Sequence, residues 1–172
     1  LYPPTRRFRL GQLAAHVVVA LIALVVIGGA TRVMEAGLAC PDWPLCFGSF
    51  LPGRQMNLQV FLEWFHRLDA FFVGIVLITQ FTLSLCWAKS LPQWLPWTYG
   101  FLTLLVAFQG FLGGLTVLQL LPSFVVVAHL AVAFTLVAIM SGVAQQLLSP
   151  GKSILPPWLR LLGFVSLLSV IG

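Results

Sequence analysis

Charged residues are scarce in this sequence. They make up 8% of its 172 residues, whereas an ordinary soluble domain carries roughly a quarter, and 60% of the residues are hydrophobic, with a mean hydropathy of +1.03. This composition excludes a water-soluble globular domain and also intrinsic disorder, which needs a polar composition poor in aromatics. The nine basic residues are separated by long apolar runs, so they form no continuous basic stripe that would bind nucleic acid.

Sequence motifs of several enzyme classes are also missing. We find no phosphate-binding loop, no zinc signature and no hydrolase nucleophile elbow. The sequence does contain long apolar runs. A helix that spans a bilayer needs about 20 mostly apolar residues. Four runs meet this requirement: 10–30, 65–87, 95–118 and 124–148. They predict an all-α, polytopic membrane protein with a bundle of four transmembrane helices.

A further apolar run opens near residue 158 and is still apolar at residue 172. It is too short for a complete span, and the chain starts at Leu1 rather than at a methionine, so we interpret the chain as a piece of a longer protein. We expect residues 1–148 to form an amino-terminal four-helix half with an outer loop at 31–62. Residues 149–172 are expected to form a cytoplasmic connector and the start of a fifth helix.

The basic residues predict the orientation of the helices. Six of them lie on one side of the membrane, with no acidic residue among them: Arg6, Arg7, Arg9, Lys89, Lys152 and Arg160. Because basic residues accumulate in cytoplasmic loops, the amino terminus is predicted to be cytoplasmic and the 31–62 loop extracytoplasmic. The six tryptophans fall near the predicted membrane interfaces and are interpreted as anchors.

Two of the three cysteines lie close together in the predicted outer loop. Cys40 and Cys46 stand six residues apart, on the side of the membrane where disulfides persist, which favours a disulfide that closes a short ring. Two free thiols or a metal site are the alternatives, but C-x5-C is a weak zinc spacing and nothing nearby completes it. Cys86 has no partner in the sequence and is interpreted as a small buried hydrophobic residue.

Glu63, His66 and Arg67 lie together where the second run enters the membrane. Ionisable groups at membrane depth are costly and are therefore candidate functional groups. Because Glu63 and His66 are three residues apart, a helix places them on one face, with a carboxylate and an imidazole directed at the same volume. The alternative is an interfacial Glu63–Arg67 pair beside a histidine whose hydrogen bonds are satisfied.

His129 lies a few residues into the fourth run, which starts on the same side of the membrane as the second. His66 and His129 are therefore expected at similar depth on different helices, where two imidazoles can ligate one haem iron from its two faces. His16 lies roughly 20 Å away, at a rise of about 1.5 Å per residue. It is assigned to a helix–helix hydrogen bond instead.

Small and basic residues occur near the level of the two histidines. Gly110 and Gly114 form a G-x-x-x-G motif, which lets a backbone or a flat ligand approach closely, although ordinary helix packing is its commoner use. Arg32 and Arg67 are candidate partners for haem propionates, because a guanidinium group matches a carboxylate. Anchoring at the membrane interface is an equal alternative for both arginines.

Three segments read together resemble the haem A synthase family. They are 28–46, 63–67 and 109–114, the last followed by His129 on the next helix. The resemblance covers essentially the whole chain. It implies a membrane enzyme that oxidises the C8 methyl of haem O to a formyl group, giving haem A for terminal oxidases. It also implies two similar four-helix halves, of which this chain resembles the first, with haem b bound in the other.

The resemblance further implies a role for individual residues. His66 and His129 match the pair expected to hold the haem substrate, Glu63 matches a catalytic carboxylate, and Cys40 and Cys46 match a cysteine pair of the outer loop. The expected location is the plasma membrane, with the haem site toward the extracytoplasmic side. The expected partners are membrane lipid, haem O synthase and oxidase assembly factors, with assembly as a homo-oligomer and without nucleic acid.

Two functions of other classes stay open. A bis-histidine b-type cytochrome that carries electrons needs both histidines but gives no reason for Glu63. A quinone-coupled thiol–disulfide exchange protein would use Cys40 and Cys46 and would not need the histidines, although its usual spacing is C-x-x-C. Because the chain resembles only the first half, we expect it to be inactive without the second.

Overall fold

The computed structural model describes residues 5–149. This part of the chain forms four long helices: α1 (Arg6–Val33), α2 (Leu58–Cys86), α3 (Leu95–Leu118) and α4 (Ser123–Leu148). Two short 3-10 turns, Gly53–Gln55 and Ala88–Ser90, precede and follow α2. The predicted connector beyond residue 149 and the predicted fifth helix lie outside the described residues.

Local signals explain where the helices begin. The side chain of Thr5 accepts a hydrogen bond from the N–H of Phe8 at the start of α1, and Asn57 does the same for Val60 at the start of α2, as helix N-caps do. The cap at Asn57 lets α2 begin at Leu58, before the apolar run that opens at residue 65. α2 is therefore longer at its start than the apolar length alone predicts.

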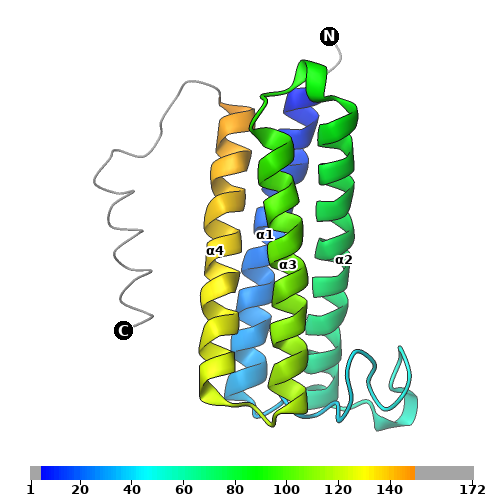
Figure 1. Cartoon of the computed structure of the whole chain (residues 1–172). Coiled ribbons are helices and arrows are strands. Elements are labelled where there is room, and N and C mark those ends of the chain that lie inside the picture. The colour runs from blue at the N-terminus through cyan, green and yellow to red at the C-terminus, as the bar shows by residue number, and fades with distance from the viewer. Residues whose placement is uncertain (1–4, 150–172) are drawn as a thin grey trace.

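The four helices form an up-and-down bundle in which consecutive helices are antiparallel (Figure 1). Each helix packs against its neighbours in sequence, and α1 packs most extensively against α4. The core along the bundle is aliphatic, with one aromatic side chain; it includes Leu10, Ala14, Val17, Leu77, Leu95, Tyr99, Leu102, Leu136 and Met140. All four helices are long and apolar enough to cross a bilayer. The predicted polytopic membrane bundle is thereby confirmed.

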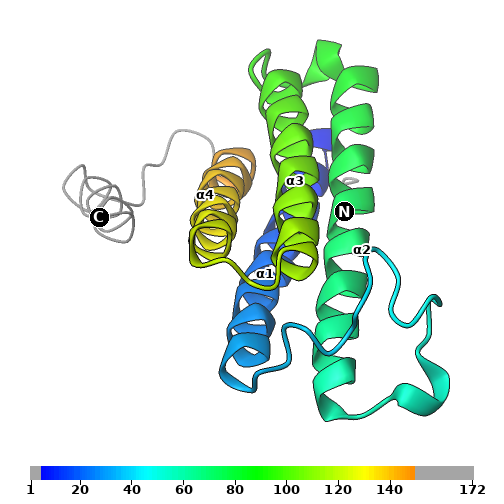
Figure 2. The same ribbon diagram turned by 60° about the horizontal axis from the view of Figure 1, so that its bottom comes forward.

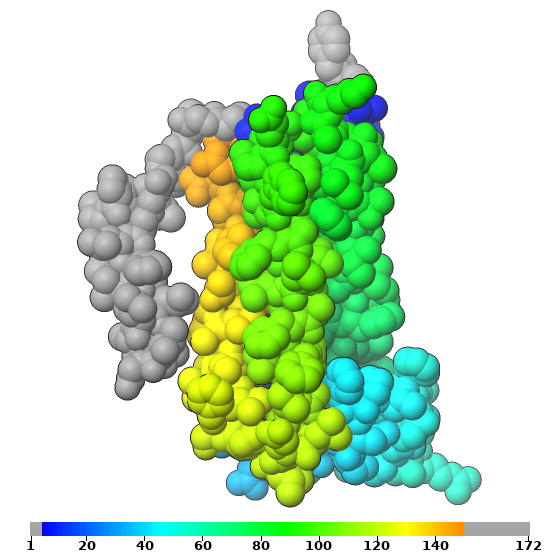
Figure 3. All heavy atoms as spheres, in the orientation of Figure 1, coloured from blue at the N-terminus to red at the C-terminus, as the bar shows by residue number. Residues whose placement is uncertain are grey.

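One end of the bundle carries the 34–57 loop, and we call it the loop end (Figures 1 and 2). α1 and α3 finish there, and α2 and α4 begin there. The last turns of α1 and α3 close alike, since the N–H of Ala36 donates to the carbonyl of Thr31 and that of Leu121 to the carbonyl of Thr116, as in Schellman motifs. The 34–57 loop forms a lobe beside the lower part of the bundle (Figure 3).

Candidate functional site

The two histidines of the predicted pair lie at the loop end. His66 lies near the start of α2 and His129 near the start of α4. Both side chains are partly buried, and both lie within the first three turns of their helices at this end. Two imidazoles from separate helices therefore share one region of the bundle.

Each imidazole lies against a glycine of an adjacent helix. A Cβ atom added to Gly28 of α1 would lie 3.2 Å from Cε1 of His66, and one added to Gly113 of α3 would lie 3.3 Å from Cε1 of His129. Both distances are shorter than ordinary van der Waals contact. A larger residue at either position would therefore force the imidazole or the helix to shift.

One nitrogen of each imidazole, Nδ1, is buried without a well-aligned hydrogen-bond partner among the described residues. The backbone of Gln109 lies near the His129 ring. Buried polar atoms without partners are uncommon in folded proteins and call for an explanation such as a bound group. The two rings therefore fit a site whose ligand engages imidazole.

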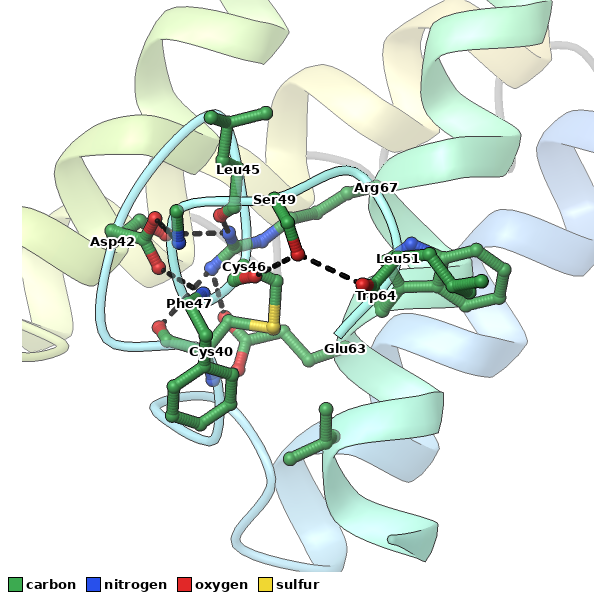
Figure 4. The surroundings of a disulfide bond; sticks show 12 residues. Cys40, Asp42, Leu45, Cys46, Phe47, Ser49, Leu51, Glu63, Trp64 and Arg67 are labelled. Atoms are coloured by element: carbon green, nitrogen blue, oxygen red, sulfur yellow. Dashed lines mark hydrogen bonds and ion pairs between the residues drawn. A yellow bond between two sulfur atoms is a disulfide. The ribbon is translucent and has the colours of Figure 1, made fainter. Parts of the chain in front are cut away.

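Both carboxylate oxygens of Glu63 have partners within the protein (Figure 4). Glu63 is buried; Oε1 forms an ion pair with Arg67, and Oε2 accepts a hydrogen bond of 2.8 Å from the N–H of Cys40. No hydrogen bond joins Glu63 to His66 within residues 5–149. The ion pair considered as the alternative for this segment is therefore present, but the histidine beside it lacks the satisfied hydrogen bonds that the alternative expected.

Arg67 is bound to the 34–57 loop. Its guanidinium donates to the carbonyls of Asp42 and Leu45 at 2.6 Å each and to that of Cys40 at 3.4 Å. Together with Glu63, these acceptors occupy a large part of its hydrogen-bonding capacity. A role for Arg67 toward a propionate would have to compete with these contacts and stays a prediction.

Arg32 has a different environment from Arg67. It is exposed at the end of α1, and its side chain forms no hydrogen bond or ion pair in the described part of the chain. It lines a hollow of about 280 Å³ together with Glu35 and Leu121. Its guanidinium is thus available to an anionic group at the loop end.

Cys40 and Cys46 form the predicted disulfide. The pair closes a ring of residues 40–46, which we call the disulfide ring, and both cysteines are buried. In the described residues, no three His, Cys, Asp or Glu side chains gather around a metal position. The prediction for Cys86 is wrong, because this thiol is exposed; the buried face of α2 at this level runs through Gln80 and Ser84.

His16 was predicted to bond to another helix, and this prediction is also wrong. Its ring is exposed, and Nδ1 lies 2.7 Å from the carbonyl oxygen of Gln12, one turn earlier in α1. A histidine on the outer face of a helix has no second helix within reach and bonds to its own backbone instead.

Comparison with known proteins identifies the family. The family model COX15-CtaA, described as cytochrome oxidase assembly protein, matches residues 12–171. The chain belongs to the COX15-CtaA family. Curated relatives named Heme A synthase also match the chain. The resemblance to the haem A synthase family is therefore confirmed.

Three relatives of this COX15-CtaA member show the extent of the similarity. Heme A synthase of Shewanella oneidensis is 32% identical over 135 residues, which cover 69% of this chain and 40% of that protein. Heme A synthase of Nitrosospira multiformis is 30% identical over 167 residues, 78% of this chain and 47% of that protein. Protoheme IX farnesyltransferase of Haloarcula marismortui is 34% identical over 73 residues, 42% of this chain and 15% of that protein.

This COX15-CtaA chain thus spans less than half the length of the haem A synthases it matches. No solved structure matches it.

The two glycines of the G-x-x-x-G motif have different neighbours in this COX15-CtaA member. A Cβ atom added to Gly114 would lie 3.2 Å from the indole of Trp43, whereas one added to Gly110 would meet nothing within 4 Å. Gly114 therefore receives a side chain of the disulfide ring, and Gly110 borders open space. Whether either glycine contacts a ligand stays a prediction.

Two residues near the histidines escaped the sequence reasoning. Gln109 on α3 donates a hydrogen bond of 2.8 Å to the carbonyl of His129 on α4, which ties the turn that carries this histidine to α3. Trp43 was interpreted as a membrane anchor, yet it packs on Gly114. Neither contact has a local signature, since each joins residues on separate elements.

Asp42 stabilises the chain just after the disulfide ring. Its carboxylate accepts hydrogen bonds from the N–H groups of Phe47, at 2.6 Å, and Gly48, at 2.8 Å. The hydrogen bonds from Gly48 and Phe47 hold the pKa of Asp42 below its usual value of 3.8. A carboxylate with a lowered pKa stabilises the fold above its unfolded pKa, and this stabilisation is lost as the pH falls through the folded pKa.

We expect Asp42→Asn to loosen this turn at neutral pH. The Phe47 and Gly48 amides should lose hydrogen-exchange protection in the variant at pH 7, and in the unaltered protein only below about pH 4. The Val60 amide, which Asn57 caps, serves as the control and should keep its protection. Unchanged protection of Phe47 and Gly48 in the variant would refute the assigned role of Asp42.

Proposed function

We propose that this chain is the haem-substrate half of a haem A synthase, in which His66 and His129 ligate the haem iron. One observation carries the proposal: two imidazoles from separate helices lie at the same end of the bundle, each against a glycine that leaves room for its ring. The relatives named Heme A synthase support the substrate class. The reaction is the oxidation of the C8 methyl of haem O to a formyl group.

The residues at the loop end fit a haem. The imidazoles have buried ring nitrogens without well-aligned partners, and imidazole is a common axial ligand of haem iron. Arg32 is exposed beside a hollow and is the better candidate for a propionate, because Arg67 already binds the disulfide ring. Gly110 borders open space, against which a flat ligand can lie.

Glu63 is the carboxylate that we assign to the reaction. Bound haem supplies the methyl carbon that is oxidised, and loss of electrons from this group develops positive charge there. A desolvated carboxylate stabilises such a charge or accepts a proton. Arg67 and the N–H of Cys40 hold the buried Glu63 in one orientation, so its charge is in place before the substrate binds. Water from the loop end supplies the one oxygen atom, and the four electrons and four protons released for each methyl group pass to an electron acceptor bound outside this half.

The proposal includes the setting of the protein. The four apolar helices contact membrane lipid, and we place them in the plasma membrane with the amino terminus cytoplasmic and the loop end outside. Residues 1–148 form the haem-substrate half, and a second half holds haem b. The similarity to Protoheme IX farnesyltransferase supports a relation to the same haem pathway, and we propose haem O synthase, oxidase assembly factors and further copies of the chain as partners.

A bis-histidine electron carrier is the second candidate. It is favoured by the finding that both oxygens of Glu63 already have partners within the protein, since a purely structural carboxylate would look the same. Thiol–disulfide exchange has less support, because Cys40 and Cys46 are 0% and 1% exposed and exchange requires access to a sulfur.

Product analysis tests the proposal. The full-length protein is purified, its haem types are identified, and it is then supplied with haem O in membranes. A haem A synthase forms the formyl product, whereas an electron carrier binds haem and leaves the methyl group unchanged. Haem bound without any formyl product would overturn the enzymatic assignment.

Gly28→Ala is expected to disturb haem binding, and Gly29→Ala is its matched control. Both substitutions favour the helix by about 1 kcal/mol. The added Cβ lies 3.2 Å from the His66 ring at position 28 and meets nothing within 4 Å at position 29. Since overpacking typically costs 1–3 kcal/mol, haem affinity in an optical titration should fall about tenfold for Gly28→Ala only. The same affinity in both variants would contradict the proposed place of His66.

A further inference from the structure

The disulfide ring touches two helices, and the geometry points to a strut made of Arg67, the disulfide ring and Trp43 that sets the spacing of the histidine pair. Arg67 and Trp43 are positioning residues in this inference, with no contact to the reacting group. The inference rests on the proposed function, because it concerns how His66 and His129 are held for one ligand.

The strut is attached to α2 through charged groups. Arg67 donates to three carbonyls of the disulfide ring, and Glu63 accepts from the N–H of Cys40. Figure 4 shows Arg67 and Glu63 extending from α2 to the disulfide ring. The side chains of Arg67 and Glu63 are 15% and 5% exposed. Moving the disulfide ring away from α2 would remove these hydrogen bonds from two largely buried charged groups, and hydrogen bonds to charged groups are stronger than those between neutral groups.

The attachment to α3 is a packing contact. The indole of Trp43 has atoms 3.2 to 3.4 Å from the position of a Cβ at Gly114, which is itself buried. Any larger residue at position 114 would force the Trp43 indole or the α3 backbone to shift. The disulfide joins Cys40 to Cys46 around Trp43, which restricts the path of the backbone between the two attachments.

The two attachments are next to the two histidine positions. Arg67 directly follows His66 on α2, and Gly114 directly follows Gly113, the residue against which His129 packs. A rigid element between these points holds α2 and α3 at one separation at the level of the imidazoles. Two ligands of one ion must be placed within about 0.5 Å, so a change in this separation alters ligation without touching either histidine.

Gly114→Ala and Arg67→Gln test the strut, with Gly142→Ala as the matched control. The control adds the same methyl group to a helix, where it meets nothing within 4 Å. In the full-length protein, titration with haem should show about a tenfold loss of affinity and a weaker low-spin bis-histidine spectrum for Gly114→Ala and Arg67→Gln. The double variant should lose little more than the larger single loss, because both substitutions act on one element. Fully additive losses would overturn the strut.

A second readout separates the strut from the proposed function. Spin labels at Phe61→Cys on α2 and Leu118→Cys on α3, both exposed positions, report the α2–α3 separation in a Cys86→Ser background. The distance distribution should shift or broaden with Gly114→Ala and Arg67→Gln but not with Gly142→Ala. Unchanged distances would overturn the strut, even where Arg67→Gln weakens haem binding through a lost propionate contact. Altered distances with unchanged ligation would overturn its positioning role. If the unaltered protein binds no haem, the proposed function fails, and the label distances alone decide the strut.

Discussion

His66→Ala and His129→Ala are each expected to abolish bis-histidine haem ligation in the full-length protein. Removing a residue that hydrogen-bonds to a metal ligand typically lowers metal affinity about 10–100-fold. Removing the ligand itself should therefore lower haem affinity more than about a hundredfold. The low-spin absorption spectrum should disappear in both variants. Optical titration and the haem content of the purified variants measure the effect.

His16→Ala is the matched control for this prediction. His16 is exposed and bonds to Gln12 within its own helix, so its removal should leave the spectrum and affinity unchanged. Added imidazole should restore part of the low-spin spectrum to His66→Ala, because Gly28 leaves space where the ring stood. An equal loss in all three variants would show that the histidines act only through stability.

Glu63→Gln is expected to reduce haem A formation by about a hundredfold or more while haem binding is kept. The glutamine retains an oxygen that can accept the hydrogen bond from Cys40, but it has no negative charge for a developing cation. The amount of formyl product per bound haem, measured over time, gives the effect on the reaction separately from that on binding.

The loop must be checked in this variant, because Glu63 also pairs with Arg67. Hydrogen-exchange protection of the Phe47 and Gly48 amides reports whether the turn held by Asp42 stays in place. Asp69→Asn is the control: Asp69 is another acid of α2, with no hydrogen bond or ion pair in the described part of the chain, and its loss should leave product formation unchanged. Full turnover of Glu63→Gln with an intact loop would assign Glu63 to the loop alone and favour the electron carrier.

Features that depend on local composition were predictable. The apolar runs predicted the third and fourth helices closely, because the cost of burying backbone in lipid makes a long apolar run helical. The disulfide was predictable since its cysteines are six residues apart. The start of α2 was missed, because its cap at Asn57 and its first turn lie outside the apolar run. The bonding of His16 and the exposure of Cys86 were missed because they depend on which face of a helix is covered.

The sequence by itself determined four membrane-spanning helices, a disulfide in the loop and two histidines near one end of the bundle. Only the tertiary structure decided what these groups touch. In the structure, His66 packs against Gly28, and Trp43 packs against Gly114. Glu63 and Arg67 form hydrogen bonds with the disulfide ring. The physical reason is distance along the chain: Arg67 and Asp42 are 25 residues apart, and no periodicity or propensity encodes a contact that exists only when separate helices pack.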